Sequence, residues 1–185
     1  RAQHSSAFAA ANREQILTAS PAETQPLLDG EIVSVDFAVL ASLPGTFGLS
    51  GDLHSLGPDT RARLAFWIAF YKTWRGFIAA SHAYPLTPVR PMTDRRGWAA
   101  LQLCNPADPR SLVFVYRLYD SRSAVRLKLR ELDTTMSYRV TDAGSGVTYD
   151  VAGATLTAQG LAAMLATPVS AAVYVIEPSA ARDTR

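Results

Sequence analysis

The 185-residue sequence predicts an α+β fold in which a broken βα piece precedes an all-β antiparallel sandwich. Two patterns predict it. Apolar residues recur at helical spacing up to about residue 85, and they alternate with polar residues at a period of two from residue 97 onward. Turn residues separate the alternating stretches. We therefore expect two domains, residues 1–85 and residues 86–185.

The first part is expected to contain mostly helix, with one long aromatic helix near its end. Leu64, Trp67 and Trp74 lie on one apolar stripe of this helix, and Arg75-Gly76 supplies the signal that ends it. The residues before it are too few to cover so much aromatic surface. The expected elements are a helix at 5–17, a loop at 18–30, a helix at 31–42, a buried strand at Thr46–Ser50 and the long helix at Pro58–Arg75.

The second part is expected to form seven short strands. In the stretch Val125–Leu129, Val and Leu alternate with Arg and Lys, which assigns one face to the core and the other to solvent. Seven strands at this spacing are typical of an antiparallel sandwich. The expected strands are Trp98–Cys104, Ser111–Tyr119, Ala124–Leu129, Ser137–Asp142, Val147–Val151, Leu161–Leu165 and Ala171–Glu177.

Composition excludes several classes of protein. Apolar residues make up 48% and charged residues 18%, a balance that excludes intrinsic disorder. A net charge of +2 without a basic stripe argues against nucleic-acid binding. No apolar run reaches the roughly 20 residues that span a membrane. The start, Arg1-Ala2-Gln3, is neither an initiator methionine nor a signal peptide, so we expect a portion of a longer protein, and the lack of an export signal favours the cytoplasm.

Few side chains suggest chemistry. His4, His54 and His82 are far apart in the sequence, so no metal site is expected. The single cysteine, Cys104, is expected to be a structural thiol. Ser50 lies in a Gly-x-Ser-x-Asp sequence that resembles a nucleophile elbow, but Asp52 occupies the position where that turn needs glycine. A serine hydrolase is therefore a poor hypothesis.

Asp52 is the one candidate for substrate contact, since the end of a strand is where barrel enzymes hold their sites. The simpler interpretation is that Asp52 fixes the turn before the long helix. Neither interpretation makes it catalytic, because no second carboxylate of equal standing accompanies it. Exposed aromatic residues such as Tyr119 and Tyr149 keep open an alternative, a stand-alone carbohydrate-binding or interaction module.

One run of residues is more specific than its composition. Gly45–Pro58 (GTFGLSGDLHSLGP), followed by Trp67–Lys72 and Arg75, resembles the last strand and helix of the catalytic barrel in α-galactosidases of glycoside hydrolase family thirty-six. The later segments are similar to strands and turns of that family's C-terminal sandwich, with Arg130-Glu131 where glycine is usual. Those segments are Trp98–Gln102, Val113–Leu118, Leu127–Asp133 leading to Tyr138–Val140, and Gly153–Leu161.

The resemblance implies the end of a (β/α)8 barrel followed by a sandwich, in a parent enzyme that hydrolyses terminal α-galactosides with retention and needs no cofactor or metal. It implies two catalytic aspartates in motifs that this sequence lacks, so we expect no catalytic residue in the chain and an inactive fragment. The partners implied are an α-galactoside bound by the parent, the rest of the barrel, and a possible second copy, but no nucleic acid and no membrane. If the chain did turn over substrate, the carboxylates would have to come from residues such as Asp36, Asp52 or Asp94.

Overall fold

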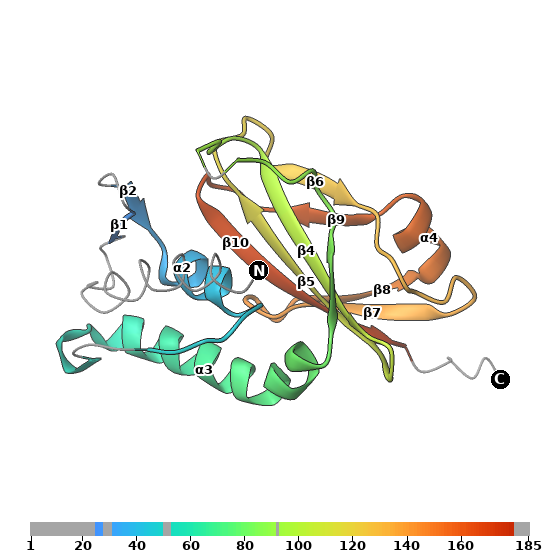
Figure 1. The fold of residues 1–185 in the computed structure, drawn as a ribbon, viewed down its shortest axis with the longest axis horizontal. Coiled ribbons are helices and arrows are strands. Elements are labelled where there is room, and N and C mark those ends of the chain that lie inside the picture. The colour runs from blue at the N-terminus through green and yellow to red at the C-terminus, as the bar shows by residue number, and fades with distance from the viewer. Residues whose placement is uncertain (1–24, 28–30, 50–52, 92, 180–185) are drawn as a thin grey trace. The chain divides into compact units, whose positions relative to one another are not determined.

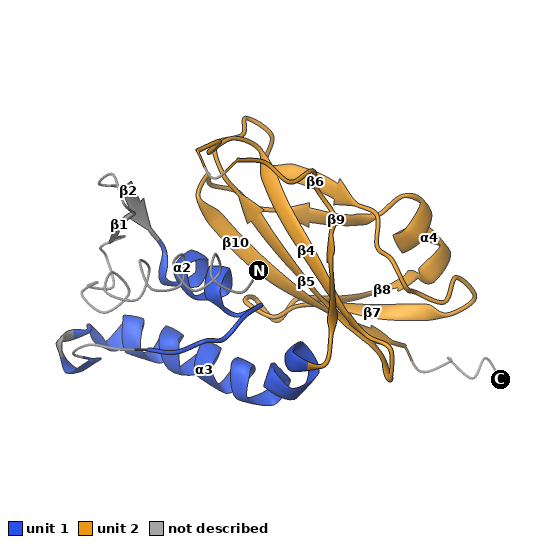
Figure 2. Ribbon diagram, viewed as in Figure 1, with its two compact units in different colours: residues 1–79 blue, residues 80–185 orange. Residues whose placement is uncertain are grey.

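The computed structural model describes residues 25–27, 31–49, 53–91 and 93–179 (Figure 1). The chain divides into two compact units, Arg1–Ala79 and Ala80–Arg185 (Figure 2). The division lies before the expected boundary at residue 85 because His82–Pro85 forms strand β3, which pairs with strand β4 of the second unit. The predicted helix at 5–17 lies outside the described residues.

The first unit begins with a short antiparallel hairpin of β1 (Gln25–Leu27) and β2 (Glu31–Val33), followed by helix α2 (Val35–Ser42). The prediction of a loop through residue 30 and of a helix starting at residue 31 was therefore wrong. Ser34 sets the start of the helix: its backbone is extended and its hydroxyl accepts a hydrogen bond from the Phe37 amide at 3.1 Å. The β-branched pair Ile32-Val33 before this cap favours a strand.

The expected buried strand at Thr46–Ser50 is not formed in its described residues. Thr46 through Leu49 have no regular secondary structure, and Thr46 is exposed. A lone strand has no partners for its backbone amides and carbonyls, and none of the described strands pairs with this segment. After it come the 3-10 turn η1 (Leu53–Ser55) and the long helix α3 (Pro58–Ala79).

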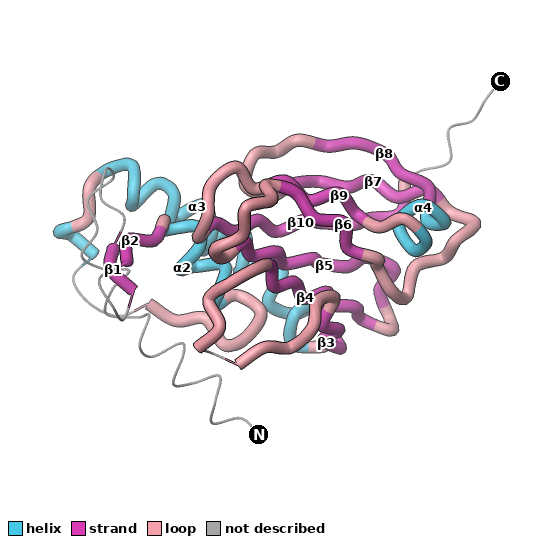
Figure 3. The backbone as a smooth tube through the Cα atoms, turned by 90° about the horizontal axis from the view of Figure 1, so that it is seen from above, coloured by secondary structure: helices cyan, strands magenta, loops and turns pink. Residues whose placement is uncertain are grey.

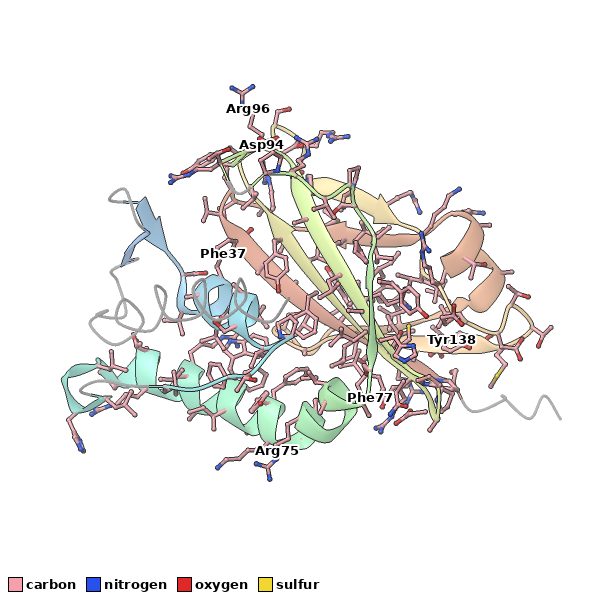
Figure 4. The ribbon with its side chains drawn as sticks, viewed as in Figure 1. Phe37, Arg75, Phe77, Asp94, Arg96 and Tyr138 are labelled. Atoms are coloured by element: carbon pink, nitrogen blue, oxygen red, sulfur yellow. The ribbon has the colours of Figure 1, made fainter. Side chains whose placement is uncertain are left out.

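Helix α3 runs four residues past its expected end at Arg75, so the prediction that Gly76 terminates it was wrong. Phe77 and Ile78 are buried on the face that also carries Trp74, and burying these side chains offsets the roughly 1 kcal/mol that a helical glycine costs. Figure 4 labels Phe77 and the exposed Arg75 on this last stretch of the helix.

Replacing Gly76 with alanine should therefore stabilise the chain by about 1 kcal/mol, the difference in helix propensity. A Cβ at this position would have no heavy atom within 4 Å, so no clash opposes the gain. Thermal unfolding should show a midpoint about 2–4 °C higher. The control is Gly146→Ala, where the space is equally open but φ is +76°, and the midpoint should fall. A lower midpoint for Gly76→Ala would mean that the helix ends before residue 76.

The second unit is built on two antiparallel sheets. The large sheet has the order β3-β4-β5-β10-β7-β8 and the small one pairs β6 with β9. Each of the seven expected strands is present, with ends shifted by a few residues; β3 and the short helix α4 (Gly153–Ala158) were not expected. The remaining bounds are β4 (Trp98–Asn105), β5 (Asp108–Arg117), β6 (Ala124–Leu127), β7 (Ser137–Asp142), β8 (Thr148–Ala152), β9 (Leu161–Met164) and β10 (Ser170–Pro178).

One core joins the two sheets. Figure 3 shows β6 and β9 lying over the large sheet, and the buried side chains of both layers form a single cluster. Its members include Val113, Tyr138 and Ile176 from the large sheet and Leu127 and Leu161 from the small one. Period-two alternation on each strand directs these residues to the shared interior.

The opposite face of the large sheet is apolar as well. Strand registers place Leu103 beside Leu112, and Phe114 beside Val173, on the face away from the cluster, and all four side chains are buried. The two central strands β5 and β10 are thus buried on both faces, which explains why Leu112–Val115 is a continuous apolar run rather than an alternating one.

Candidate functional site

Asp36, in the first unit, accepts three hydrogen bonds from two side chains. Its Oδ1 accepts hydrogen bonds from Arg63 Nε at 2.6 Å and from Trp67 Nε1 at 2.7 Å, and its Oδ2 accepts one from Arg63 Nη2 at 2.7 Å. The Arg63 guanidinium also lies 4.9 Å from the centre of the Trp67 ring. This bidentate pair ties the first turn of α2 to α3. A carboxylate engaged in this way is a structural link rather than a nucleophile.

Asp94 is also engaged, on the loop before β4. Its Oδ2 accepts a hydrogen bond from Arg90 Nη1 at 2.9 Å, and its Oδ1 accepts one from the Arg96 amide at 3.1 Å. The Arg96 backbone N–H and the Arg90 side chain hold the pKa of Asp94 below its usual value, so it cannot act as a general acid near neutral pH. Figure 4 labels Asp94 and Arg96 together on this loop.

The remaining residues of the sequence predictions divide into two groups. Asp52, Ser50 and His4 lie outside the described residues. His54 and His82 are exposed, in η1 and β3, and within the described ranges no group of three or more His, Cys, Asp or Glu residues is placed to hold a metal ion. No helix of the described part of the chain is long and apolar enough to cross a membrane.

Cys104 is buried on β4, with its sulfur 4.0 Å from the Arg130 carbonyl oxygen. Burial, with a smaller contribution from Glu131, raises the pKa of this thiol to about 11. The thiolate is the reactive form, and it is scarce at neutral pH with such a pKa. The expected structural role of Cys104 agrees with this environment.

Tyr119 and Tyr149 are both exposed, by 44% and 41%, but they cannot form one platform. Tyr149 pairs with Val140, Val140 with Ile176, and Ile176 with Ser111, so Tyr149 is level with the start of β5. Tyr119, in contrast, follows the end of that strand. Ser111 and Arg117 alone are about 20 Å apart at 3.3 Å per residue. A sugar could therefore stack on one of the two tyrosines but not on both.

A shallow open depression lies beside Tyr149 on strands β7 and β8. Arg139, Thr148, Tyr149 and Asp150 line it. Arg139 Nε lies 3.6 Å from Asp150 Oδ1, which also accepts a hydrogen bond from the Ser179 hydroxyl at 3.1 Å. The Arg139–Asp150 ion pair offers polar groups that a sugar can use, although the register of Tyr149 with Val140 directs the Tyr149 side chain to the other face of the sheet. This depression is the described surface on which the carbohydrate-binding alternative can be tested.

The motif residues Gly153 and Gly160 have structural roles. A Cβ on Gly153 would clash with the Asp133 carbonyl oxygen, and a Cβ on Gly160 would lie 2.7 Å from the Leu127 carbonyl carbon. Gly160 also has φ +91°. Between them the buried Leu156 accepts a hydrogen bond at its carbonyl from the Leu129 amide. The motif therefore packs the segment from β8 to β9 against neighbouring backbone, and it carries no chemistry.

Sequence reasoning missed two of the buried polar side chains on the inner face of the large sheet, Gln102 and Arg117. Gln102 is fully buried: its Nε2 donates to the Arg130 carbonyl at 2.9 Å and its Oε1 accepts from the Arg130 amide at 2.8 Å. Arg117 is 5% exposed at the end of β5. Both occupy inward positions of alternating strands, and this placement was the only signal that could have identified them.

Comparison with solved structures shows that this chain has a fold found within α-galactosidases of glycoside hydrolase family 36 (GH36). The resemblance inferred from the sequence is thereby confirmed at the level of fold. The GH36 α-galactosidase AgaA of Geobacillus stearothermophilus, in complex with raffinose, matches 88% of this chain at a TM-score of 0.69 and 19% identity. AgaB of the same organism matches 87% at 0.70 and 19% identity. The α-galactosidase of Lactobacillus brevis matches 84% at 0.67 and 15% identity.

The chain spans about 21% of the length of each of these solved chains. The matched 88% of the chain contains more residues than either compact unit, so the match includes residues of both units. No protein-family model matches the sequence, and no curated protein matches it significantly.

Proposed function

We propose that this chain is the C-terminal, non-catalytic portion of an α-galactosidase-like glycoside hydrolase, with the first unit as the end of a catalytic (β/α)8 barrel and the second as an accessory β-sandwich. The observation that carries the proposal is the fold match, which covers 88% of this chain and about a fifth of GH36 α-galactosidases. The order of the sequence motifs, barrel end first and sandwich after it, supports the same assignment.

Features of the first unit support its role as part of a larger barrel. Thr46–Leu49 forms no strand here, as expected for a barrel strand whose neighbours belong to another part of the protein. Along α3, Phe66 is 41% exposed, and Phe70 and Tyr71 are only half-buried. Aromatic side chains with this much free surface are typical of a helix that packs on further elements.

The second unit supports the barrel in this proposal. The large sheet is apolar on both faces, so it can pack on the small sheet with one face and on a further layer with the other. Asp36 and Asp94, the two described carboxylates named as candidates from the sequence, are held by arginine side chains. The aspartate pair of retaining hydrolysis, about 5 Å apart, would come from the parent upstream of residue 1, with Asp52 as a possible sugar contact.

The parent's coding sequence tests the proposal. Upstream of Arg1 it should encode the two motifs that the resemblance requires, a strand ending in Lys-x-Asp and a Cys-Ser-Gly-Gly-Gly segment followed by an aspartate. The parent should then hydrolyse raffinose, a sugar bound by AgaA in its solved complex. An upstream sequence without either motif would contradict the proposal.

The carbohydrate-binding alternative rests on the depression around Tyr149 and makes a different prediction. Under this alternative, the isolated chain should bind galactose or raffinose saturably. Tyr149→Ala should abolish the binding, and Tyr119→Ala should leave it unchanged. If the second unit is an accessory sandwich as proposed above, neither the unmodified chain nor the two variants should bind these sugars saturably. Isothermal titration distinguishes the two.

A further inference from the structure

Arg117 is a buried cation that contacts only neutral acceptors. Its Nη1 donates to the carbonyl oxygens of Leu165 at 2.7 Å and Ala166 at 2.8 Å, and its Nη2 donates to the Asp120 carbonyl at 2.7 Å. The nearby Asp120 carboxylate accepts instead from Arg122, at 3.1 and 3.2 Å. Among the described residues, the Arg117 guanidinium thus donates to no carboxylate, although its side chain is almost fully buried and Asp120 interacts with it electrostatically.

Trp98 lies directly across from Arg117. The register of β4 and β5 pairs these two residues, so their side chains emerge side by side on the inner face of the sheet. Trp98 is 7% exposed and Arg117 5%. Within the described part of the chain, neither Trp98 Nε1 nor Arg117 Nε donates a hydrogen bond to any protein acceptor.

Two unpaired buried donors on directly paired residues are rare, because nearly all buried polar groups in folded proteins are hydrogen-bonded. Each unpaired donor bears the full cost of its desolvation. The cost is greater for Arg117, because its guanidinium is buried and the Asp120 carboxylate acts on it through charge alone, without a hydrogen bond. A single small acceptor between Trp98 and Arg117 would remove both costs.

We propose that Trp98 Nε1 and Arg117 Nε bind a monoatomic anion of chloride size inside the second unit. A halide neutralises the guanidinium charge, which a water molecule does not do, and its attraction to the guanidinium is strong in a low-dielectric interior. A spherical ion needs no more than the two donors that this residue pair offers. An oxyanion would leave most of its oxygens without donors in a core otherwise lined by apolar residues such as Ala100 and Val115.

The test is a halide titration of the full chain observed at the tryptophan indoles. The sequence has three tryptophans, so a ¹H–¹⁵N spectrum shows three indole cross-peaks, and Trp98→Phe identifies the one from Trp98. Sodium chloride or bromide replaces sodium gluconate at constant ionic strength. We expect the Trp98 peak to shift saturably, while the peak of Trp67, whose Nε1 already donates to Asp36, stays in place.

Stability gives a second readout. At halide concentrations several-fold above the dissociation constant, the unfolding midpoint should rise by about 2–4 °C relative to gluconate. Trp98→Phe removes one donor without changing charge and should abolish most of this rise. Arg96→Gln, which removes an exposed cation near β4, should retain it. A Trp98 peak and an unfolding midpoint that do not change with halide concentration would overturn the proposal.

Discussion

Replacing Gly153 with alanine should destabilise the second unit by about 3 kcal/mol, at the upper end of the range for overpacking a tight site. The new Cβ would clash with the Asp133 carbonyl oxygen and lie 3.0 Å from the Tyr138 ring and 3.1 Å from the Met136 carbonyl oxygen. Two of these neighbours are backbone, and the Gly153 amide itself donates to Met136 O at 2.8 Å, so the site cannot widen by rotating a side chain. Denaturant unfolding measures the loss.

Gly146→Ala is the matched control for this experiment. Gly146 lies in the connection between β7 and β8, with φ +76°, and a Cβ there meets no atom within 4 Å, so only the backbone conformation opposes the change. We expect a loss of about 1 kcal/mol. Equal losses at Gly146 and Gly153 would mean that close packing of α4 against the loop at 133–136 is not what requires the glycine.

Replacing Gln102 with leucine should cost about 2 kcal/mol, since it removes two hydrogen bonds to the Arg130 backbone at roughly 1 kcal/mol each. Gln102 holds both the amide and the carbonyl of Arg130, the residue before Glu131, whose φ of +55° is rare for a side chain other than glycine. The Gln102 amide therefore fixes a loop that is strained at Glu131, where a glycine would adopt the same φ at little cost. Unfolding in urea measures the cost.

Ser111→Ala separates the two functions of Gln102. The Ser111 hydroxyl accepts a longer bond from Gln102 Nε2, at 3.3 Å, and its loss leaves both Arg130 bonds intact. We expect less than about 1 kcal/mol. A loss as large as that of Gln102→Leu would place the stabilisation in the Gln102–Ser111 contact and contradict the role assigned to Arg130.

The strands of the second unit could be predicted from the sequence because alternation and turn residues are local signals. Val125–Leu127 shows its face assignment directly. Helix α4 could not be predicted, because six residues rich in threonine and alanine carry no helical period; Leu156 is held there by burial against residues distant in the chain. The same holds for α3 beyond Gly76, where packing of Phe77 and Ile78 overrides a local stop signal.

The candidate site was less predictable for a related reason. Asp36 stands in the sequence as one carboxylate among sixteen acidic residues, and only the folded chain brings Arg63 and Trp67 to it. The partnership of Gln102 with Arg130, 28 residues apart, is likewise a tertiary contact. The family motifs indicated the fold because their glycines meet steric requirements, but they hold no information on groups that lie outside this chain.

The central claim is that this chain has the fold of an α-galactosidase portion without its catalytic carboxylates. The most direct test is turnover of an aryl α-galactoside by the purified chain, with circular dichroism to establish that it is folded. We expect a folded chain with no turnover above the uncatalysed rate. Turnover that persists through purification and is lost on Asp36→Asn, Asp52→Asn or Asp94→Asn would contradict the claim, because the catalytic pair would then lie within these residues.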